Sequence, residues 1–265
     1  MRTVHVSEDI RLNGGFEEFV IESDRDLDLS ISAEGECQAF FRILSAKSLR
    51  IRGHVSALSD VSLVFWNEGR QTLRTDESYE VNGNARFVSA YGECSGGMTD
   101  RSVYVALREK NAQAEVLTAS LINEVKNYRI QVVNFAPKTY GEIRNFAVVL
   151  EKGKLMIDAI GKIVKNAKGA KSHQTSRSMS FAKGQSATIL PELLIDENDV
   201  EASHAMSIGR VDDEQLYYLM SRGLTMKQCT ALISAGYLLP VTEVIRNEEL
   251  RTTLAQELER KIESL

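Results

Sequence analysis

From residue 16 to about residue 200 the chain consists of short segments in which apolar and polar residues alternate. Leu27, Leu29 and Ile31 are separated by Asp or Ser, for example. The same period recurs in the segments 49–52, 61–65, 103–107 and 130–132. A period of two places the apolar side chains on one face, which is the pattern of half-buried β-strands. Helical periodicity is weak throughout this region, so we expect no helical crossovers between the strands.

The alternation predicts an all-β body without choosing its architecture. A β-sandwich, a β-barrel and a solenoid of stacked rungs all bury one face of each strand. Apolar segments around Ile51, Ile130 and Leu155 recur at irregular spacing, so no clean repeat selects the solenoid.

The pattern changes after Gly209, where apolar residues adopt helical spacing. Asp212, followed three residues later by Gln215, resembles a capping box, and Gly223 is placed to end this first helix. Its buried stripe is expected to consist of Leu216, Leu219 and Met220. We accordingly divide the chain into a β domain over 1–209 and a helical domain over 210–265.

Two further helices are expected. Thr225 and Gln228 repeat the capping box, and Gly236 is placed to end the second helix. Leu232 and Ile233 are expected to supply its apolar face, with Cys229 on the same side. Pro240 suits a first helical turn. The apolar face of the last helix is expected to contain Leu250, Leu254, Leu258, Ile262 and Leu265.

Length and composition narrow the class of protein. A chain of 265 residues with 43% hydrophobic content can build a sizeable core, and a net charge of −5 gives no general attraction for nucleic acid or anionic membranes. There is no run of eighteen apolar residues and no apolar signal-peptide core. Cys37, Cys94 and Cys229 are widely spaced and odd in number, which predicts free thiols in a reducing compartment. We therefore expect a cytoplasmic protein.

Candidate chemistry centres on one histidine. The sequence contains no GxSxG, HExxH, P-loop or Rossmann glycine motif. A histidine is more often structural than a ligand, but His204 follows a group of carboxylates, Asp196, Glu197, Asp199 and Glu201. Imidazole and carboxylate together bind divalent iron or zinc, so His204 is a candidate metal ligand.

Two other features have ordinary explanations. The turn 222–224 joins two helices as in a helix-turn-helix, but the second helix offers few base-reading side chains on an acidic protein, so DNA binding is a minor alternative. A run of basic residues lacks interleaved aromatic residues and is interpreted as a solvated strand face rather than a phosphate-binding patch. It comprises Lys162, Lys165, Lys168, Lys171, Arg177 and Lys183.

Four motifs in the C-terminal half are more specific than the periodicity. They are PELLI (191–195) with the acidic turn after it, SHAMSIG (203–209), DDEQLYYLMSRG (212–223) and SAGY (234–237). Together they resemble the C-terminal core of the SufB/SufD family, the scaffold proteins of the SUF iron–sulfur cluster assembly system. The resemblance covers about residues 138–238 and is closer to SufD, in a short form.

The resemblance implies a right-handed parallel β-helix followed by a small C-terminal α-helical domain. It implies a non-catalytic scaffold that pairs through its β-helix, as a homodimer or as a heterodimer with a SufB-like subunit. It also implies that an ABC-type ATPase resembling SufC docks on the helical domain. The docking residues are then expected to be Asp212, Glu214, Gln215, Tyr218, Arg222 and Gly223.

The family histidine falls on His204, which the resemblance places, with Glu201, in a candidate site for iron or a transient iron–sulfur cluster at a dimer interface. The cysteine of SufB members would fall near Ser176, and Ala202 stands where SufD members often carry a cysteine. We therefore expect His204 to need ligands from elsewhere.

Two other function classes stay open. Parallel β-helices also serve carbohydrate-active enzymes, which present a carboxylate cluster in an external groove, often with calcium. Only the segment 196–201 offers such a cluster in this sequence. The second class is a DNA-binding or purely structural interaction module.

Overall fold

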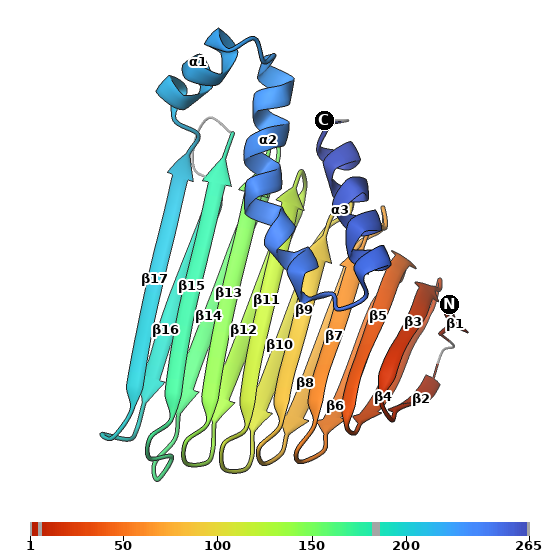
Figure 1. Ribbon diagram of the computed structural model, residues 1–265, viewed down its shortest axis with the longest axis vertical. Coiled ribbons are helices and arrows are strands. Elements are labelled where there is room, and N and C mark those ends of the chain that lie inside the picture. The colour runs from red at the N-terminus through yellow and green to blue at the C-terminus, as the bar shows by residue number, and fades with distance from the viewer. Residues whose placement is uncertain (1, 5–6, 182–185, 264–265) are drawn as a thin grey trace.

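The computed structural model describes residues 2–4, 7–181 and 186–263, which form two β-sheets with helices against one of them (Figure 1). The odd-numbered strands form one sheet, the odd sheet, and the even-numbered strands form the other, the even sheet. The odd sheet contains β1 (Arg2–Thr3), β3 (Gly15–Glu22), β5 (Glu36–Ser45), β7 (Asp60–Asn67), β9 (Arg86–Glu93), β11 (Gln113–Ile122), β13 (Tyr140–Val149), β15 (Lys171–Ser180) and β17 (Glu201–Arg210). The even sheet contains β2 (Ser7–Leu12), β4 (Asp26–Ala33), β6 (Ser48–Val55), β8 (Leu73–Val81), β10 (Thr99–Leu107), β12 (Val125–Asn134), β14 (Lys154–Ile163) and β16 (Ala187–Ile195).

The chain alternates between the two sheets, so each rung contributes one strand to each sheet. The paired strands within each sheet are parallel, as a coil of stacked rungs requires. Of the three architectures that the alternation left open, the protein therefore adopts the solenoid. The expected fold class, a parallel β-helix followed by helices, is confirmed.

The number of residues per rung changes along the chain. Phe19 pairs with Phe41, 22 residues later, whereas Gln174 pairs with His204, 30 residues later. Because the rungs lengthen toward the C-terminus, equivalent positions have no constant spacing, and no repeat is visible in the sequence.

The main core lies inside the coil, between the two sheets. In β4, buried positions alternate strictly with exposed ones, as the sequence pattern predicts. Four aromatic rings from successive odd strands stack inside, with neighbouring centroids 4.8, 4.8 and 5.4 Å apart. They belong to Phe19, Phe41, Phe65 and Tyr91. Rung-to-rung stacking of this kind buries large apolar surfaces and fixes the register of neighbouring strands.

A second core, the outer core, lies on the outer face of the odd sheet. It is closed by α2 (Met226–Leu238), the 3₁₀-helix η1 (Leu239–Val244) and α3 (Glu248–Glu263) (Figure 1). Its buried residues include Phe40, Val64, Trp66, Ala90, Leu117 and Val148 of the sheet and Leu238, Val241, Ile245, Leu254, Leu258 and Ile262 of the C-terminal segment that contains the helices. The expectation of one buried face per strand is therefore wrong for β7 and β9, which are buried almost throughout.

The helical tail, α1 (Asp213–Ser221) through α3, agrees with the sequence in most details. Thr225 and Gln228 form the predicted capping box, Cys229 is buried, and Pro240 occupies the first turn of η1. The expected apolar face of α2 is half-buried at Ile233 but exposed at Leu232, which lines a groove and is not covered by the sheet. Gly236 does not end the second helix, because α2 continues to Leu238. The side chain of Leu238 is buried in the outer core. The predicted stripe of the last helix is buried at Leu254, Leu258 and Ile262, and its Leu265 lies outside the described residues.

The first helix, α1, differs from its prediction. None of its residues, all of which are described, is buried, and the expected stripe is half-buried at Leu216 and Leu219 and exposed at Met220. Figure 1 shows the reason: α1 lies beyond the ends of β15 and β17 and not over the sheet. Its apolar side therefore has no sheet to cover.

The last strand ends at Arg210 and α1 begins at Asp213, while α2 to α3 share the outer core with the odd sheet. The division into two domains at 209–210 stays a prediction. None of the described helices is long and apolar enough to cross a membrane.

Candidate functional site

His204 lies on β17, the last strand of the odd sheet (Figure 1). β17 pairs with β15 on one side, where His204 stands beside Gln174, and no described strand pairs with its other edge. Every residue of β17 is exposed. A free strand edge presents unpaired backbone N–H and C=O groups, so β17 can accept a further strand.

Glu201 and His204 face opposite sides of the odd sheet, because side chains alternate along a strand. His204 stands beside Gln174, which faces the interior of the coil and is buried. Glu201 lies on the outer face, where Oε2 is 2.7 Å from Nζ of Lys171 and Oε1 is 3.7 Å from Nε2 of His173. The structure therefore does not bring together the two residues of the expected iron site.

His173, which the sequence did not single out, is central to the outer side. Its Nδ1 lies 2.7 Å from Oγ of Ser203, and its ring centroid lies 5.7 Å from that of Tyr140. The hydrogen bond and charge of Lys171 lower the pKa of Glu201. These partners come from different rungs, so no sequence signal joins them. Of the predicted basic run, Lys171 pairs in this way and Lys183 lies outside the described residues.

The interior beside His204 is polar. Oγ1 of Thr118 donates to Oδ1 of Asn145 at 2.7 Å, and Nδ2 of Asn145 donates to Oγ of Ser176 at 3.1 Å. Nε2 of Gln174 donates to the backbone oxygen of Glu192 at 2.8 Å, while its Oε1 has no partner among the described residues. The position where a SufB-type cysteine would fall is thus a buried, hydrogen-bonded serine.

In the acidic turn before His204, the carboxylate of Glu197 has a structural role. This carboxylate accepts from the backbone N–H groups of Asn198 and Asn166, both at 2.9 Å, and these bonds lower its pKa. Among the described residues, no group of three or more His, Cys, Asp and Glu side chains is placed to hold a metal ion. Within the described part of the chain, His204 therefore stands outside any such group.

The terminal rung, β16 and β17, also exposes large apolar side chains. They are Leu190, Leu194, Ile195, Met206 and Ile208. Met206 and Ile208 lie on the same face of β17 as His204, because they follow it at intervals of two. A free backbone edge together with exposed apolar side chains is a feature of a protein–protein interface.

The six expected docking residues all lie on α1 or at its ends. Asp212 caps the helix by accepting from the backbone N–H of Glu214 at 2.9 Å, in place of the predicted box with Gln215. The Arg222 guanidinium lies 5.1 Å from the ring centroid of Tyr218. Gly223 has a φ of +95°, which suits glycine at a helix end.

Two features next to these residues were missed by the sequence reasoning. Tyr217 on α1 is 77% exposed, an unusual state for so large an aromatic side chain. A groove of about 280 Å³ runs between α2 and α3. It is lined by Leu224, Gln228, Ala231, Leu232, Ala235 and Glu259. An exposed aromatic side chain and a mainly apolar groove each favour contact with another protein.

The sequence reasoning also missed a charged cluster inside the coil, formed by Glu77, Glu93, Arg101 and Lys126. Nη1 of Arg101 lies 2.7 Å from Oε1 of Glu77, and its Nη2 lies 3.6 Å from Oε2 of Glu93. Nζ of Lys126 lies 3.3 Å from Oε1 of Glu93 and also donates to Ser95. Two carboxylates and two cations thus balance one another in the interior.

Tyrosines complete this cluster. Tyr79 and Tyr91 both donate to Oε2 of Glu77, at 2.8 and 2.6 Å, and Arg101 lies 4.3 Å from the ring centroid of Tyr91. Burial acts to raise the pKa of Glu93, but the charges of Lys126 and Arg101, together with hydrogen bonds from Ser95 and Asn67, outweigh it and hold that pKa below its usual value. Because the charged groups of this cluster have ion-pair and hydrogen-bond partners inside the coil, the cluster is more consistent with a structural role than with a binding site.

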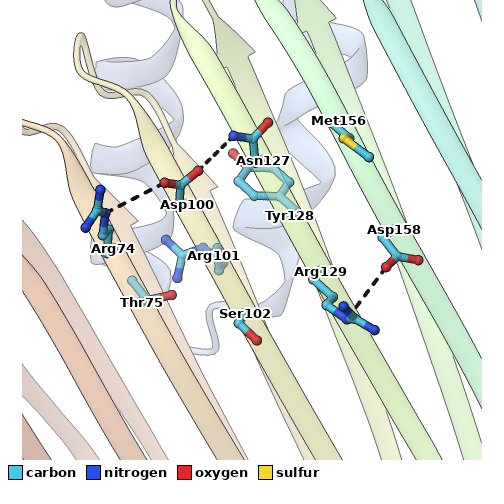
Figure 2. Close-up of a pocket in the computed structure, with 10 residues that line it drawn as sticks. All are labelled: Arg74, Thr75, Asp100, Arg101, Ser102, Asn127, Tyr128, Arg129, Met156 and Asp158. Atoms are coloured by element: carbon cyan, nitrogen blue, oxygen red, sulfur yellow. Dashed lines mark hydrogen bonds and ion pairs between the residues drawn. The ribbon is translucent and has the colours of Figure 1, made fainter.

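Figure 2 shows a groove of about 350 Å³ on the outer face of the even sheet. Asp100 lies between Nδ2 of Asn127, at 2.8 Å, and Nε of Arg74, at 3.9 Å. Nε of Arg129 lies 3.6 Å from Oδ2 of Asp158. The carboxylates that line this groove are paired across strands, which is typical of a solvated sheet face. The groove gives no support to the carbohydrate-active alternative.

Known proteins with similar sequences agree with the motifs. Residues 17–237 match the SufBD core domain, described as "SUF system FeS cluster assembly". The iron–sulfur cluster assembly protein SufD of Bacillus subtilis (strain 168) is 36% identical over 139 residues, which cover 52% of this chain and 32% of that protein. SufD of Escherichia coli (strain K12) is 29% identical over 104 residues, which cover 39% of this chain and 25% of that protein.

A SufBD family protein of Staphylococcus epidermidis (strain ATCC 12228) is 24% identical over 186 residues, which cover 69% of this chain and 40% of that protein. The chain thus spans well under two thirds of the length of these curated relatives. The family match nevertheless includes the coil from β3 onward, the terminal rung with His204, and both α1 and most of α2. The chain belongs to the SufBD core family of the SUF system for iron–sulfur cluster assembly.

Proposed function

We propose that this chain is a non-catalytic assembly subunit of a SUF-type iron–sulfur cluster biogenesis complex. One observation carries the proposal: the terminal rung and α1 are both uncovered, and both lie within the region that matches the SufBD core domain. A protein that leaves a strand edge and an apolar helix side exposed has surfaces suited to partners. The odd number and wide spacing of the three cysteines agree with a reducing compartment, so we place the complex in the cytoplasm.

The first partner is a second scaffold, either another copy of this chain or a SufB-like subunit. The free edge of β17 supports this pairing, since an added strand would satisfy its backbone groups. Met206 and Ile208 would become buried at the same time.

The second partner is an ABC-type ATPase of the SufC kind, docked on α1 and α2. The exposed rings of Tyr217 and Tyr218 support this proposal, because aromatic side chains are enriched among the residues that dominate binding energy. The groove between α2 and α3 includes Leu224, at the junction of α1 and α2, and offers a further apolar contact.

Iron or a transient cluster is the cargo of such a complex. His204 faces the uncovered end of the coil and would supply one ligand at the scaffold interface. Because Glu201 faces Lys171 and His173 on the outer side, we assign the ligand role to His204 alone.

The test is co-expression of the full chain with a SufC-like ATPase and a SufB-like scaffold from the same source. We expect a stable complex on gel filtration that loads iron and sulfide anaerobically. If the two partners assemble with an established SufD but leave this chain unbound, the proposal is wrong. Homodimer formation without the SufB-like subunit would identify a second copy as the scaffold partner.

A further inference from the structure

One buried amide ties the helical tail to the N-terminal half of the coil. Gln38 lies on β5, faces the outer side of the odd sheet and is only 3% exposed. Its Nε2 donates to the backbone oxygen of Val244 at 3.0 Å, and its Oε1 accepts from the backbone N–H of Arg246 at 2.9 Å. A single side chain thus satisfies a carbonyl and an amide of the segment between η1 and α3.

Charged contacts surround this amide. Nη1 of Arg246 lies 2.9 Å from Oε1 of Glu36, and its Nη2 lies 2.6 Å from Oδ1 of Asp60. On α3, Oε2 of Glu257 lies 3.3 Å from Nη2 of Arg42. These pairs are partly exposed and so weaker than their distances suggest. The buried hydrogen bonds of Gln38 are the firmer attachment.

The remaining attachment of the tail to the sheet is mainly the apolar packing of the outer core. Hydrophobic burial is non-directional, so it holds helices against a sheet without fixing where along the sheet they lie. Hydrogen bonds to a buried amide have narrow geometry and are costly to leave unmade. Gln38 therefore fixes the turn between η1 and α3, and through it the position of α2.

We propose that Gln38 is a positioning residue for the docking helices: by holding Val244 and Arg246, it sets where α2, and α1 attached to it, are presented. The identity of the partner, an ABC-type ATPase, rests on the proposed function, whereas the attachment of the helices does not. Strands β5 and β7, several rungs away from β17 in Figure 1, thereby control the orientation of a surface at the other end of the coil.

The test compares Gln38→Met, which keeps the side-chain length and removes both hydrogen bonds, with the wild-type full chain. Hydrogen exchange is measured over residues 226–262 and over the strands, and affinity for the ATPase is measured in parallel. We expect exchange in α2, η1 and α3 to rise roughly tenfold or more while the strands keep their protection. ATPase affinity should fall.

Two further variants make the result specific. Gln38→Glu can still accept from the Arg246 N–H, but its carboxylate cannot donate to Val244 and repels that carbonyl oxygen, so its exchange should also rise and its affinity should also fall. Asn145→Leu removes an equally buried amide inside the coil. It should loosen the strands without a selective effect on the tail.

Unchanged exchange in the tail of Gln38→Met overturns the proposal, and so does increased exchange with unchanged ATPase affinity. If Gln38→Met does not fold, Gln38→Glu is judged by the same criteria. If the wild-type chain does not bind the ATPase at all, the proposed function fails, and the exchange measurement alone decides whether Gln38 holds the helices.

Discussion

His204 and Glu201 are three residues apart on β17 and face opposite sides of the odd sheet. His204 stands beside the buried Gln174 at the uncovered end of the coil, and Glu201 pairs with Lys171 on the outer face. Residues that appear to be one site in the sequence therefore belong to two different surfaces. They are expected to respond to substitution in different ways.

His204→Ala is expected to reduce iron loading of the reconstituted scaffold–ATPase complex while leaving folding stability within about 0.5 kcal/mol of wild type, since the residue is exposed. Glu201→Gln is expected to keep wild-type loading. Iron per complex and thermal unfolding are the measurements. His54→Ala, at an exposed position on β6, is the matched control. Full loading of His204→Ala would contradict the ligand assignment.

The sequence predicted the strand faces well wherever only the interior of the coil decides burial. β4 alternates as expected, whereas Val64 and Trp66 are buried at positions that should be exposed. The residues that cover them come from the helical tail, more than 150 positions later in the chain, and no local pattern reports such a contact. The repeat could not be predicted either, because the rung spacing grows from 22 to 30 residues and equivalent positions therefore have no constant period.

Met206→Asp is expected to prevent scaffold pairing, because it places a carboxylate on the apolar face of the terminal rung. Gel filtration with light scattering should report the monomeric chain. Met156→Asp is the matched control, since Met156 is 46% exposed and Met206 is 48% exposed, but Met156 lies on the outer face of the even sheet. Pairing that survives Met206→Asp would exclude the terminal rung as the interface.

Tyr218→Ala is expected to weaken ATPase binding by about 1–3 kcal/mol, the range of an aromatic residue central to an interface. Isothermal titration with the SufC-like ATPase measures the change. Phe135→Ala provides the control, because Phe135 is also exposed and also stacks with an arginine, Arg108 at 4.6 Å, but lies on the coil. Equal losses for the two variants would mean that the effect is not specific to α1.

Two members of the charged cluster interrupt the apolar alternation of the sequence. In β10 the alternating buried positions include Val105, Val103 and Arg101, so a charged residue occupies an interior position. Glu77 interrupts β8 in the same way, between Thr75 and Tyr79. That these charges meet could not be predicted, because their contacts depend on the register between rungs.

Arg101→Met is expected to destabilise the fold by about 3–5 kcal/mol, because it leaves Glu77 and Glu93 buried without their guanidinium partner. Urea unfolding followed by circular dichroism measures the loss. Adding Glu77→Gln should restore part of it, since one unpaired charge is then removed. Arg74→Met, at a residue whose side chain is 75% exposed, is expected to stay within about 0.5 kcal/mol of wild type. A small effect of Arg101→Met would mean that the cluster is not held by its ion pairs.

Glu93 gives the stability a defined pH dependence. Burial opposes ionisation, but Lys126 and Arg101, with hydrogen bonds from Ser95 and Asn67, outweigh it, so the folded-state pKa lies below the unfolded value of about 4.3. The contribution of Glu93 to the free energy of unfolding is therefore complete above the unfolded-state pKa. It is lost as the pH falls through the folded-state pKa. We expect the urea concentration at the unfolding midpoint to decrease as the pH is lowered below about 4. Glu93→Gln is expected to remove part of this slope of the midpoint against pH. Glu80→Gln, whose carboxylate pairs with Arg108 at the surface, should keep the slope, and an unchanged slope in Glu93→Gln would show that Glu93 does not carry it.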